Sequence, residues 1–436
     1  MSVWRIGSNY GEEGSVAEVF RQYKIAFAGD ENPQERIRTE VLTTDIVAIT
    51  SGLRIIAVGR VLDKKMLSEI GPVLSERFGD IHALVLEPLF WRNDDEEWLS
   101  YEGQGTQFSK SHGRYEDEII KIFNDRNKQY QENKMKHEII ALLEANKQVV
   151  LTGAPGTGKT YLALQIAAKM IGLDKIDDLK DNNERFRFVQ FHPAYDYTDF
   201  VEGLKPVKAS NNTNNSIGFE RRDGVFMDFC KKAAKQDGKP CIFVIDEINR
   251  ADLSRVFGEL FFALESDYRE KPVDTQYASL REENEEKQFY VPKNVFLIGT
   301  MNDIDRSVES IDFALRRRFA WYEVKADEAR FDAVISGTAL EDRIKEEAKK
   351  RYLSLNQAIG ETLELGESYQ IGPAYFLKLQ KCIAAANNDI WTTFWKRHLE
   401  LLIREYVRGW PKSKKDEQIK KFEAAYRLAP EPPAQS

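Results

Sequence analysis

The sequence contains little cysteine and no long apolar run. Its 436 residues include three cysteines, Cys230, Cys241 and Cys382, which are too scattered for a disulfide scaffold and lack the spacing of a zinc site. We expect them to be buried free thiols in a reducing cytosol. No apolar run approaches the roughly 20 residues of a membrane-spanning helix, and the first residues lack the apolar core of a signal peptide. We therefore expect a cytoplasmic protein with no membrane partner.

Basic residues are also fewer than acidic ones. The chain has 63 Lys and Arg against 71 Asp and Glu, which gives a formal net charge of −8. A protein that works only by coating nucleic-acid phosphates is usually basic. Any contact with nucleic acid therefore needs a local basic surface or an assembled pore.

The chain is also too long for one ordinary core, so we expect two or three domains.

A complete phosphate-binding motif lies near the middle of the chain. Residues 153–160 read Gly-Ala-Pro-Gly-Thr-Gly-Lys-Thr, which fits the pattern G-x-x-x-x-G-K-[ST]. The apolar run 148–151 predicts a buried strand before it, and residues 161–170 predict a helix after it. Glycines between the two allow backbone N–H groups to face phosphate oxygens at the helix N-terminus.

Each residue of this motif has an expected task. Lys159 would reach the β- and γ-phosphates of a nucleoside triphosphate, and the Thr160 hydroxyl would bind Mg²⁺. The nucleotide-binding residues predicted here are Gly153, Ala154, Pro155, Gly156, Thr157, Gly158, Lys159, Thr160 and Tyr161.

Polar residues follow two further apolar strands. Asp246 and Glu247 come directly after the run 241–245, and Asn302 follows the run 295–299. Asp246 can contact Mg²⁺ and the nucleotide, and Glu247 can orient and deprotonate the attacking water. Asn302 would lie at the strand ends, where ligands collect in open α/β sheets, so that its amide could hold that water.

Three consecutive arginines, residues 316–318, lie further along the chain. Successive side chains point around most of a helix end, so not all three can face one phosphate. One or two could act as arginine fingers on the nucleotide of a neighbouring subunit. For any single arginine, the alternative is a solvated basic helix end that the helix dipole favours.

Composition predicts how the chain divides. The strand and helix patterns alternate in the central part, which is typical of a parallel sheet covered by helices on both faces. The expected segments are an N-terminal α/β recognition domain (1–105), a Gly/Ser-rich linker (106–116), a nucleotide-binding core (117–326), a helical lid (327–428) and a flexible Pro-rich tail (429–436).

These elements together resemble an AAA+ nucleoside triphosphatase, and more narrowly the McrB family of restriction motor subunits. The resemblance covers about residues 138–409, and its motifs are residues 191–203, 243–254, 301–307, 371–376 and 404–409. It implies an α/β fold with a parallel-sheet P-loop core, a C-terminal helical lid and a small α/β N-terminal domain.

The family implies a ring, commonly a hexamer, with nucleotide between subunits. GTP is the usual substrate of the family, and ATP remains open here because no motif reads a purine edge. In the family, the last two arginines of such a triplet act on the nucleotide bound by the neighbouring subunit. The resemblance therefore implies this role for Arg317 and Arg318. Asp303 stands where the family signature has threonine, which leaves the nucleotide choice open. The family also implies a separate McrC-type endonuclease partner, and we find no nuclease motif in this chain.

Residues 4–10 and 45–61 resemble the EVE/PUA-like modules, small barrels that flip a modified base into an aromatic pocket. Stacking and edge contacts need aromatic and polar side chains, and a place in the core is the alternative for Trp4 and Trp91. Residues 1–110 carry a net charge of −6, so the ligand could be DNA, a protein, a modified RNA or a small nucleotide. The candidates are Trp4, Ser8, Asn9, Tyr10, Trp91 and Trp98.

Three functions fit these observations. The first is a ring motor, driven by GTP or ATP hydrolysis, in a McrBC-like defence system that recognises modified DNA. The second is a MoxR-like AAA+ chaperone that remodels protein complexes. The third is a regulatory binding module whose ATPase times assembly. The signature at residues 301–305 and the lid motifs favour the first.

Overall fold

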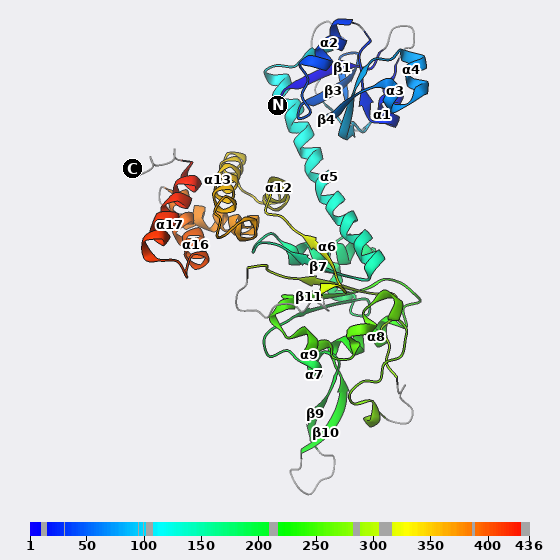
Figure 1. The fold of residues 1–436 in the computed structure, drawn as a ribbon, viewed down its shortest axis with the longest axis vertical. Coiled ribbons are helices and arrows are strands. Elements are labelled where there is room, and N and C mark those ends of the chain that lie inside the picture. Colours follow the sequence, from blue (N-terminus) through cyan, green and yellow to red (C-terminus); the bar gives the residue numbers. More distant parts are fainter. Residues whose placement is uncertain are drawn as a thin grey trace. The chain divides into compact units, whose positions relative to one another are not determined.

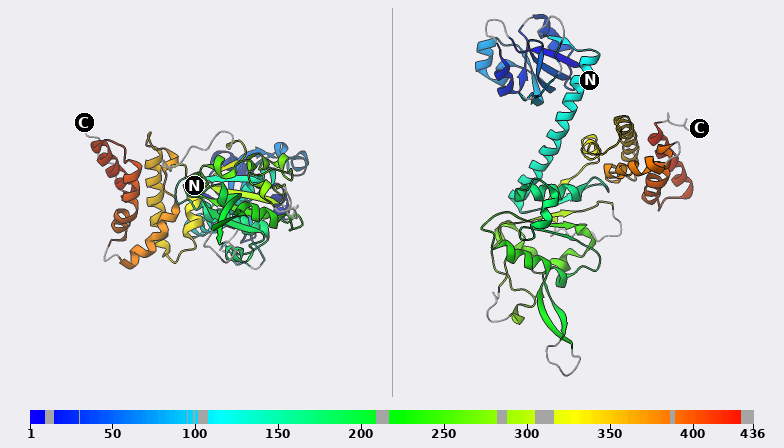
Figure 2. Two further views of the ribbon diagram at one scale, coloured as in Figure 1. Left: turned by 90° about the horizontal axis from the view of Figure 1, so that it is seen from below. Right: turned by 180° about the vertical axis from the view of Figure 1, so that it is seen from behind.

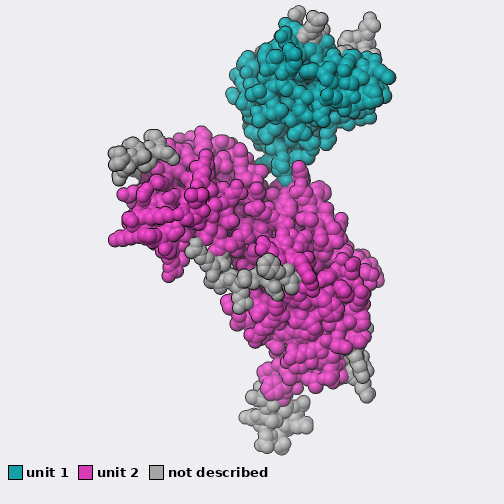
Figure 3. Space-filling model, in the orientation of Figure 1, with its two compact units in different colours: residues 1–131 teal, residues 132–436 magenta. Residues whose placement is uncertain are grey.

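The computed structural model describes residues 1–9, 15–29, 31–94, 96–98, 100–101, 108–208, 217–281, 288–304, 316–385 and 389–428. The chain forms two compact units, Met1–Gln131 and Glu132–Ser436 (Figure 3). Helix α5, Arg114–Asn146, contains the division between them. The composition of residues 116–145 predicts a helix there, which the structure confirms. The predicted tail, 429–436, lies outside the described residues. Among the described helices, none is long and apolar enough to cross a membrane.

The first unit is built on a six-stranded mixed sheet (Figure 1). Its strand order is β2-β5-β4-β3-β1-β6, with β1 parallel to β3 and antiparallel to β6. The apolar runs 45–52, 53–61 and 82–87 predict strands, and the structure confirms them as β3, β4 and β5. The strands are β1 (Val3–Gly7), β2 (Ile25–Ala26), β3 (Ile46–Ser51), β4 (Arg54–Met66), β5 (His82–Trp91) and β6 (Phe108–Lys110), and the helices are α1 (Ala17–Tyr23), α2 (Glu31–Thr39), α3 (Leu67–Ile70) and α4 (Pro72–Phe78).

Side chains of β3 divide between the two faces of this sheet. Val47 and Ile49 belong to one apolar cluster, and Ile46 and Ala48 belong to another that also includes Phe123 of α5. This alternation follows from the two-residue period of a strand, and it makes both faces apolar. Strand β6 falls within the segment predicted as a linker. The apolar Phe108 accounts for this difference, because it packs on one of these faces.

The second unit contains a five-stranded parallel sheet in the order β13-β7-β12-β11-β8. The runs 148–151, 187–191, 241–245 and 295–299 predict four of these strands, and the sequence does not predict the edge strand β13. The core elements are β7 (Gln148–Thr152), α6 (Lys159–Ile171), β8 (Phe186–Gln190), α7 (Tyr197–Phe200), α8 (Val225–Ala233), β11 (Cys241–Asp246), α9 (Leu253–Phe257), α10 (Leu260–Ala263), β12 (Val295–Thr300) and β13 (Ala320–Glu323).

Helices cover both faces of this sheet (Figures 1 and 2). Along β11, Phe243 and Ile245 pack with α7, α8 and α9, whereas Ile242 and Val244 pack with α5 and α6. Both faces of β11 are therefore buried, which explains its uninterrupted apolar sequence. All three cysteines are buried and free, as expected.

A β-hairpin separates helix α7 from helix α8. Its strands are β9 (Glu202–Lys208) and β10 (Ile217–Asp223), and residues 209–216 between them lie outside the described residues. The Glu202 carboxylate at its base is fully buried and accepts hydrogen bonds from Arg221 (3.0 Å), Arg281 (3.4 Å) and the Tyr277 backbone (2.8 Å). The base of the hairpin is thus fixed by a buried ionic network.

The C-terminal part of the second unit is helical, as predicted. Its helices enclose their own apolar core, with Phe331, Tyr352 and Trp395 among its buried aromatic residues. This part is called the lid below. Its helices are α12 (Glu328–Ile335), α13 (Asp342–Gly360), α14 (Leu379–Ala385), α15 (Ile390–Phe394), α16 (Glu400–Tyr406) and α17 (Lys412–Arg427), with a π-helix at Trp395–Leu399.

Candidate nucleotide site

The phosphate loop joins β7 to α6, as the sequence predicts. Gly153, Gly156 and Gly158 have φ values of 132°, 81° and 82°, a region that glycine enters without steric penalty. The Thr157 hydroxyl is buried and donates to the Ala154 carbonyl at 3.1 Å. The glycines therefore permit a tight turn that ends at the N-terminus of α6.

Lys159 lies under this loop and is almost fully buried. Its ammonium donates to the carbonyls of Gly153 and Ala154, both at 2.8 Å. Burial lowers the pKa of the Lys159 ammonium to about 8, and nearby carboxylates, of which Asp303 acts most strongly, oppose the shift. Tyr161, also predicted at the nucleotide, lies in the first turn of α6 with 58% of its surface exposed.

Asp246 and Thr160 meet at the end of β11. The Thr160 hydroxyl donates to Asp246 Oδ1 at 2.7 Å. The Thr300 hydroxyl donates to the same oxygen at 2.7 Å, and the Gln190 amide donates to Oδ2 at 3.1 Å. A hydroxyl and a carboxylate are oxygen ligands of the kind that Mg²⁺ prefers, so this pair fits a magnesium site beside the phosphate loop.

Glu247 is held in a strained backbone conformation. Its φ and ψ are 52° and 47°, which are sparsely populated for residues other than glycine and are often found at active sites. Its backbone N–H donates to Thr300 Oγ1 at 3.2 Å. Its carboxylate accepts from Asn302 Nδ2 at 2.8 Å and pairs with Arg250 at 3.4 Å. The two side chains predicted to handle the attacking water therefore lie in contact.

Asp303, the departure from the family signature, lies beside the phosphate loop. Desolvation by its surroundings raises the pKa of the Asp303 carboxyl. The Lys159 ammonium and the backbone N–H of Gly153 oppose that shift. A carboxylate in this position acts electrostatically on Lys159, which the threonine of the signature could not do.

The two predicted trans-acting arginines differ in their surroundings. Arg317 is exposed, whereas the Arg318 side chain is only 12% exposed. Arg318 pairs with Glu265 at 2.7 Å and lies over the Phe261 ring. Its carbonyl accepts a hydrogen bond from the buried Gln148 side chain at 2.7 Å. Of this pair, Arg317 is therefore the more accessible arginine.

Sequence reasoning missed two residues that complete the site. Thr300 and Gln190 occupy the last positions of β12 and β8, and both donate to Asp246. Their positions at the ends of apolar strands could have indicated them, because the carboxyl ends of parallel strands meet at one edge of the sheet. A single threonine or glutamine after an apolar run is nevertheless too common to stand out without the strand order.

The structure shows which candidate base-binding residues of the first unit are buried and which are accessible. Trp4 is 1% exposed, its Nε1 donates to Asp45 at 2.9 Å, and its ring stacks on Phe108 at 5.1 Å. It is a core residue and presents no face to a base. Ser8 is also fully buried, whereas Asn9 is exposed and Tyr10 lies outside the described residues. Trp91 and Trp98 are half-buried, with Arg21 and Arg126 over their rings at 4.6 and 5.9 Å.

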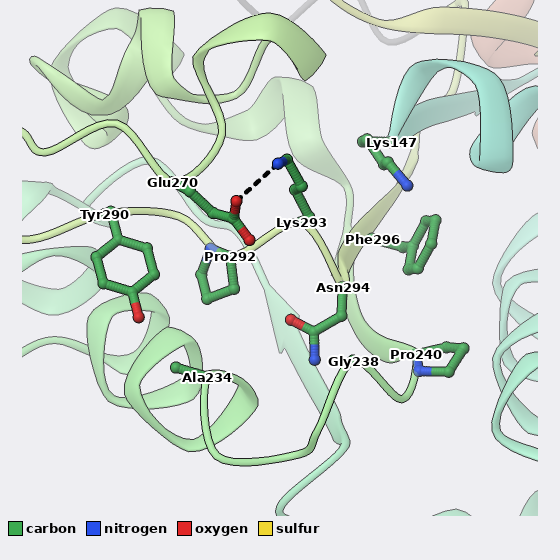
Figure 4. A pocket seen from close by; sticks show the side chains of 10 residues that line it. All are labelled: Lys147, Ala234, Gly238, Pro240, Glu270, Tyr290, Pro292, Lys293, Asn294 and Phe296. Carbon is green, nitrogen blue, oxygen red and sulfur yellow. Dashed lines mark ion pairs between the residues drawn. The ribbon is translucent and has the colours of Figure 1, made fainter.

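A pocket of about 370 Å³ lies at the opposite end of the same sheet (Figure 4). It is lined by Lys147, Pro240 and Asn294, which directly precede β7, β11 and β12. Lys293 and Glu270 form an ion pair across it at 2.7 Å. The pocket thus lies at the amino ends of the strands, whereas ligands of parallel sheets collect at the carboxyl ends. It is therefore separate from the candidate nucleotide site.

Comparisons with known proteins agree with this geometry. Residues 148–319 match the family "AAA domain (dynein-related subfamily)". The chain is 39% identical over 243 residues to the "Type IV methyl-directed restriction enzyme EcoKMcrB subunit" of Escherichia coli (strain K12), covering 55% of this chain and 49% of that subunit. It is 30% identical over 223 residues to the "Type II restriction enzyme BsuMI component YdiS" of Bacillus subtilis (strain 168), covering 45% of this chain and 61% of that component.

A structural match is much weaker. The structure of C. elegans PCH-2 matches with a TM-score of 0.23 and 14% identity, covering 68% of this chain and 69% of that chain, and such a score supports no conclusion. The matched regions span less than two thirds of the length of both bacterial relatives. The matched family, the sequence relatives and the site nevertheless agree. Residues 148–319 therefore resemble an AAA domain, and about half of the chain resembles the McrB subunit, in the region that contains the candidate nucleotide site.

Proposed function

We propose that the chain is a Mg²⁺-dependent triphosphatase that hydrolyses GTP or ATP by in-line attack of water on the γ-phosphate. One observation carries the proposal: Thr160, the adjacent pair Asp246 and Glu247, and Asn302 come from three separate segments and meet beside the phosphate loop. Such an arrangement can bind a triphosphate, its metal ion and an attacking water at once.

Each side chain has a defined task in this proposal. The loop amides and Lys159 bind the phosphates, and Thr160 and Asp246 would hold Mg²⁺, which neutralises phosphate charge when bound. Glu247 accepts the proton of the attacking water, and Asn302 orients that carboxylate and the water. Thr300 fixes both acidic residues, because it bonds to the Asp246 side chain and the Glu247 backbone.

We further propose that the chain acts as a ring, commonly a hexamer, in which Arg317 and Arg318 complete the site of the neighbouring subunit. Positive charge from a neighbour stabilises the transition state and couples hydrolysis to assembly. The exposure of Arg317 supports this role. Arg318 would have to exchange its Glu265 contact for the neighbour's phosphate, or act by holding Arg317 in place.

The biological setting proposed for this motor is a McrBC-like restriction system. The names of the two bacterial relatives, both restriction components, support it. In this setting the first unit, whose sequence resembles the EVE/PUA-like modules, would recognise modified DNA. A McrC-like endonuclease subunit would cut the DNA, since we assign no nuclease activity to this chain.

Steady-state hydrolysis tests the proposal. GTP and ATP would each be supplied to the purified protein, with and without modified or plain duplex DNA, and Glu247→Gln protein would control for contaminating phosphatases. We expect Mg²⁺-dependent turnover that responds to modified DNA, and a preference for GTP would favour the McrB-like motor. ATP-selective turnover that ignores DNA would favour the MoxR-like chaperone instead. No turnover of either nucleotide would refute the triphosphatase mechanism.

A further inference from the structure

Four consecutive carbonyls of the phosphate loop each accept a hydrogen bond from the lid. Their donors come from two separate lid segments, the start of α12 and residues 372–374. The bonds are Gly372 N–H to Pro155 at 2.9 Å, Ala374 N–H to Gly156 at 2.9 Å, Arg330 Nε to Thr157 at 2.6 Å, and Arg330 Nη2 to Gly158 at 3.1 Å.

Arg330 supplies two of these bonds from a buried position. It lies in the first turn of α12 and is 3% exposed. Asp327 caps that helix by accepting from the Arg330 N–H at 2.8 Å, which fixes the start of the side chain. Burial lowers the pKa of the Arg330 guanidinium, and the carboxylates of Glu132 and Asp327 oppose the shift. An arginine in this setting stays charged and makes strong, directional bonds.

The second lid segment approaches the loop as closely as backbone allows. A Cβ atom added at Gly372 would lie 2.0 Å from the carbonyl carbon of Gly156, and one added at Gly156 would lie 2.8 Å from the Tyr375 ring. Only glycine fits at both positions. The lid and the phosphate loop therefore have complementary surfaces with no room for a side chain between them.

These bonds set the direction of the amides that would bind phosphate. In a trans peptide the C=O and N–H groups point in opposite directions. Fixing the carbonyls of residues 155–158 toward the lid therefore turns the N–H groups of residues 156–159 toward the interior of the loop. Those N–H groups are the ones expected to bind phosphate oxygens in a P-loop.

We infer that Arg330 is a positioning residue for the nucleotide phosphates, and that it couples the lid to the phosphate loop without touching the nucleotide. The inference rests on nucleotide binding by this loop and on no choice between GTP and ATP. By thermodynamic reciprocity, a lid that orders the loop for nucleotide must itself be ordered by nucleotide.

The test compares two arginines of the same lid. Arg330→Met removes both bonds to the loop while keeping an unbranched apolar stem, and Arg330→Lys keeps the charge. Arg351→Met is the matched control, because Arg351 is also largely buried but bonds to Glu347 and to the Tyr426 carbonyl within the lid. Binding of a fluorescent GTP analogue and of a fluorescent ATP analogue, each with Mg²⁺, gives Kd for every variant. Hydrogen exchange follows the amides of residues 154, 156–160 and 328–335.

We expect Arg330→Met to raise the nucleotide Kd roughly 10-fold, because charge-assisted hydrogen bonds are lost. Hydrogen exchange in the phosphate loop should become faster. Arg330→Lys should lie between this variant and wild type. Arg351→Met should lower the melting temperature but leave the Kd unchanged. In wild type, nucleotide should slow exchange in α12 as well as in the loop.

Three results would overturn the inference: a folded Arg330→Met protein with wild-type Kd, an equal loss in Arg351→Met, or no nucleotide-linked protection of α12. The last is measured on wild type, so it decides the matter even if Arg330→Met does not fold. A wild-type chain that binds neither analogue would instead refute the triphosphatase proposal itself, and this result is visible without any variant.

Discussion

Replacing Thr300 by valine should uncouple the two acidic residues of the site with little change in volume. The Thr300 hydroxyl donates to Asp246 Oδ1 at 2.7 Å and accepts the Glu247 backbone N–H at 3.2 Å. Valine has the same shape and can do neither. The backbone of Glu247 is in a left-handed conformation that costs about 1–2 kcal/mol and must be held by its surroundings. We expect Glu247 to lose its fixed orientation.

The size of the effect follows from the two lost bonds. A hydrogen bond to a charged group contributes about 1.5–3 kcal/mol, and a buried N–H without a partner costs about 1–3 kcal/mol. Some of this loss will lower the free energy of unfolding, and the rest will raise the barrier to hydrolysis. If about half appears in the barrier, kcat falls about 10- to 100-fold.

Steady-state hydrolysis and nucleotide binding, measured on one preparation, separate these effects. We expect kcat to fall in Thr300→Val while the nucleotide Kd changes less, because the Thr300 hydroxyl bonds to the two acidic residues, Asp246 and Glu247. Thr300→Ser keeps the hydroxyl and should retain most of the turnover. A folded Thr300→Val protein with wild-type kcat would show that this hydroxyl does not organise the catalytic residues.

Three further predictions concern the same site. Glu247→Gln should abolish turnover and keep nucleotide binding, and hydrolysis at the wild-type rate would exclude Glu247 as the base. Arg317→Ala should lose turnover without a lower melting temperature, and mixing it with Lys159→Ala subunits should restore part of the activity. Arg318→Ala should lose turnover and also lower the melting temperature, because it breaks the contact with Glu265. Chelation of Mg²⁺ should stop hydrolysis reversibly, and Thr160→Ala should raise the Mg²⁺ concentration needed for half-maximal rate, whereas turnover in excess chelator would refute the metal requirement.

Much of the second unit could be predicted because its signals are local. The apolar runs before Gly153 and Asp246 are long enough to specify buried strands, and the glycines of the phosphate loop follow a fixed spacing. Strand β13 was not predictable in the same way. Its four residues, 320–323, are too short to show a period, and it is a strand because it pairs with β7 at the sheet edge.

The contacts between the lid and the core could not be predicted at all. Arg330 lies 172 residues from Gly158 in the sequence, and nothing in the residues around it distinguishes it from the other arginines of the lid. The same holds for Trp4, which a sequence can assign equally to a pocket or to a core. Its burial is decided by the Asp45 carboxylate and the Phe108 ring, which come from distant segments.

The ionic network at the base of the β9–β10 hairpin has a consequence for how this family of chains can diversify. Glu202 is anchored by Arg221 and Arg281 from outside its own strand, so the geometry at the base does not depend on the sequence between the two strands. Insertions and deletions after Lys208 can then accumulate without disturbing helices α7 and α8, because loop length adds only a small entropic term. Natural variation should therefore concentrate beyond this anchor, which makes the hairpin a place where new binding specificities can evolve at little risk to the fold.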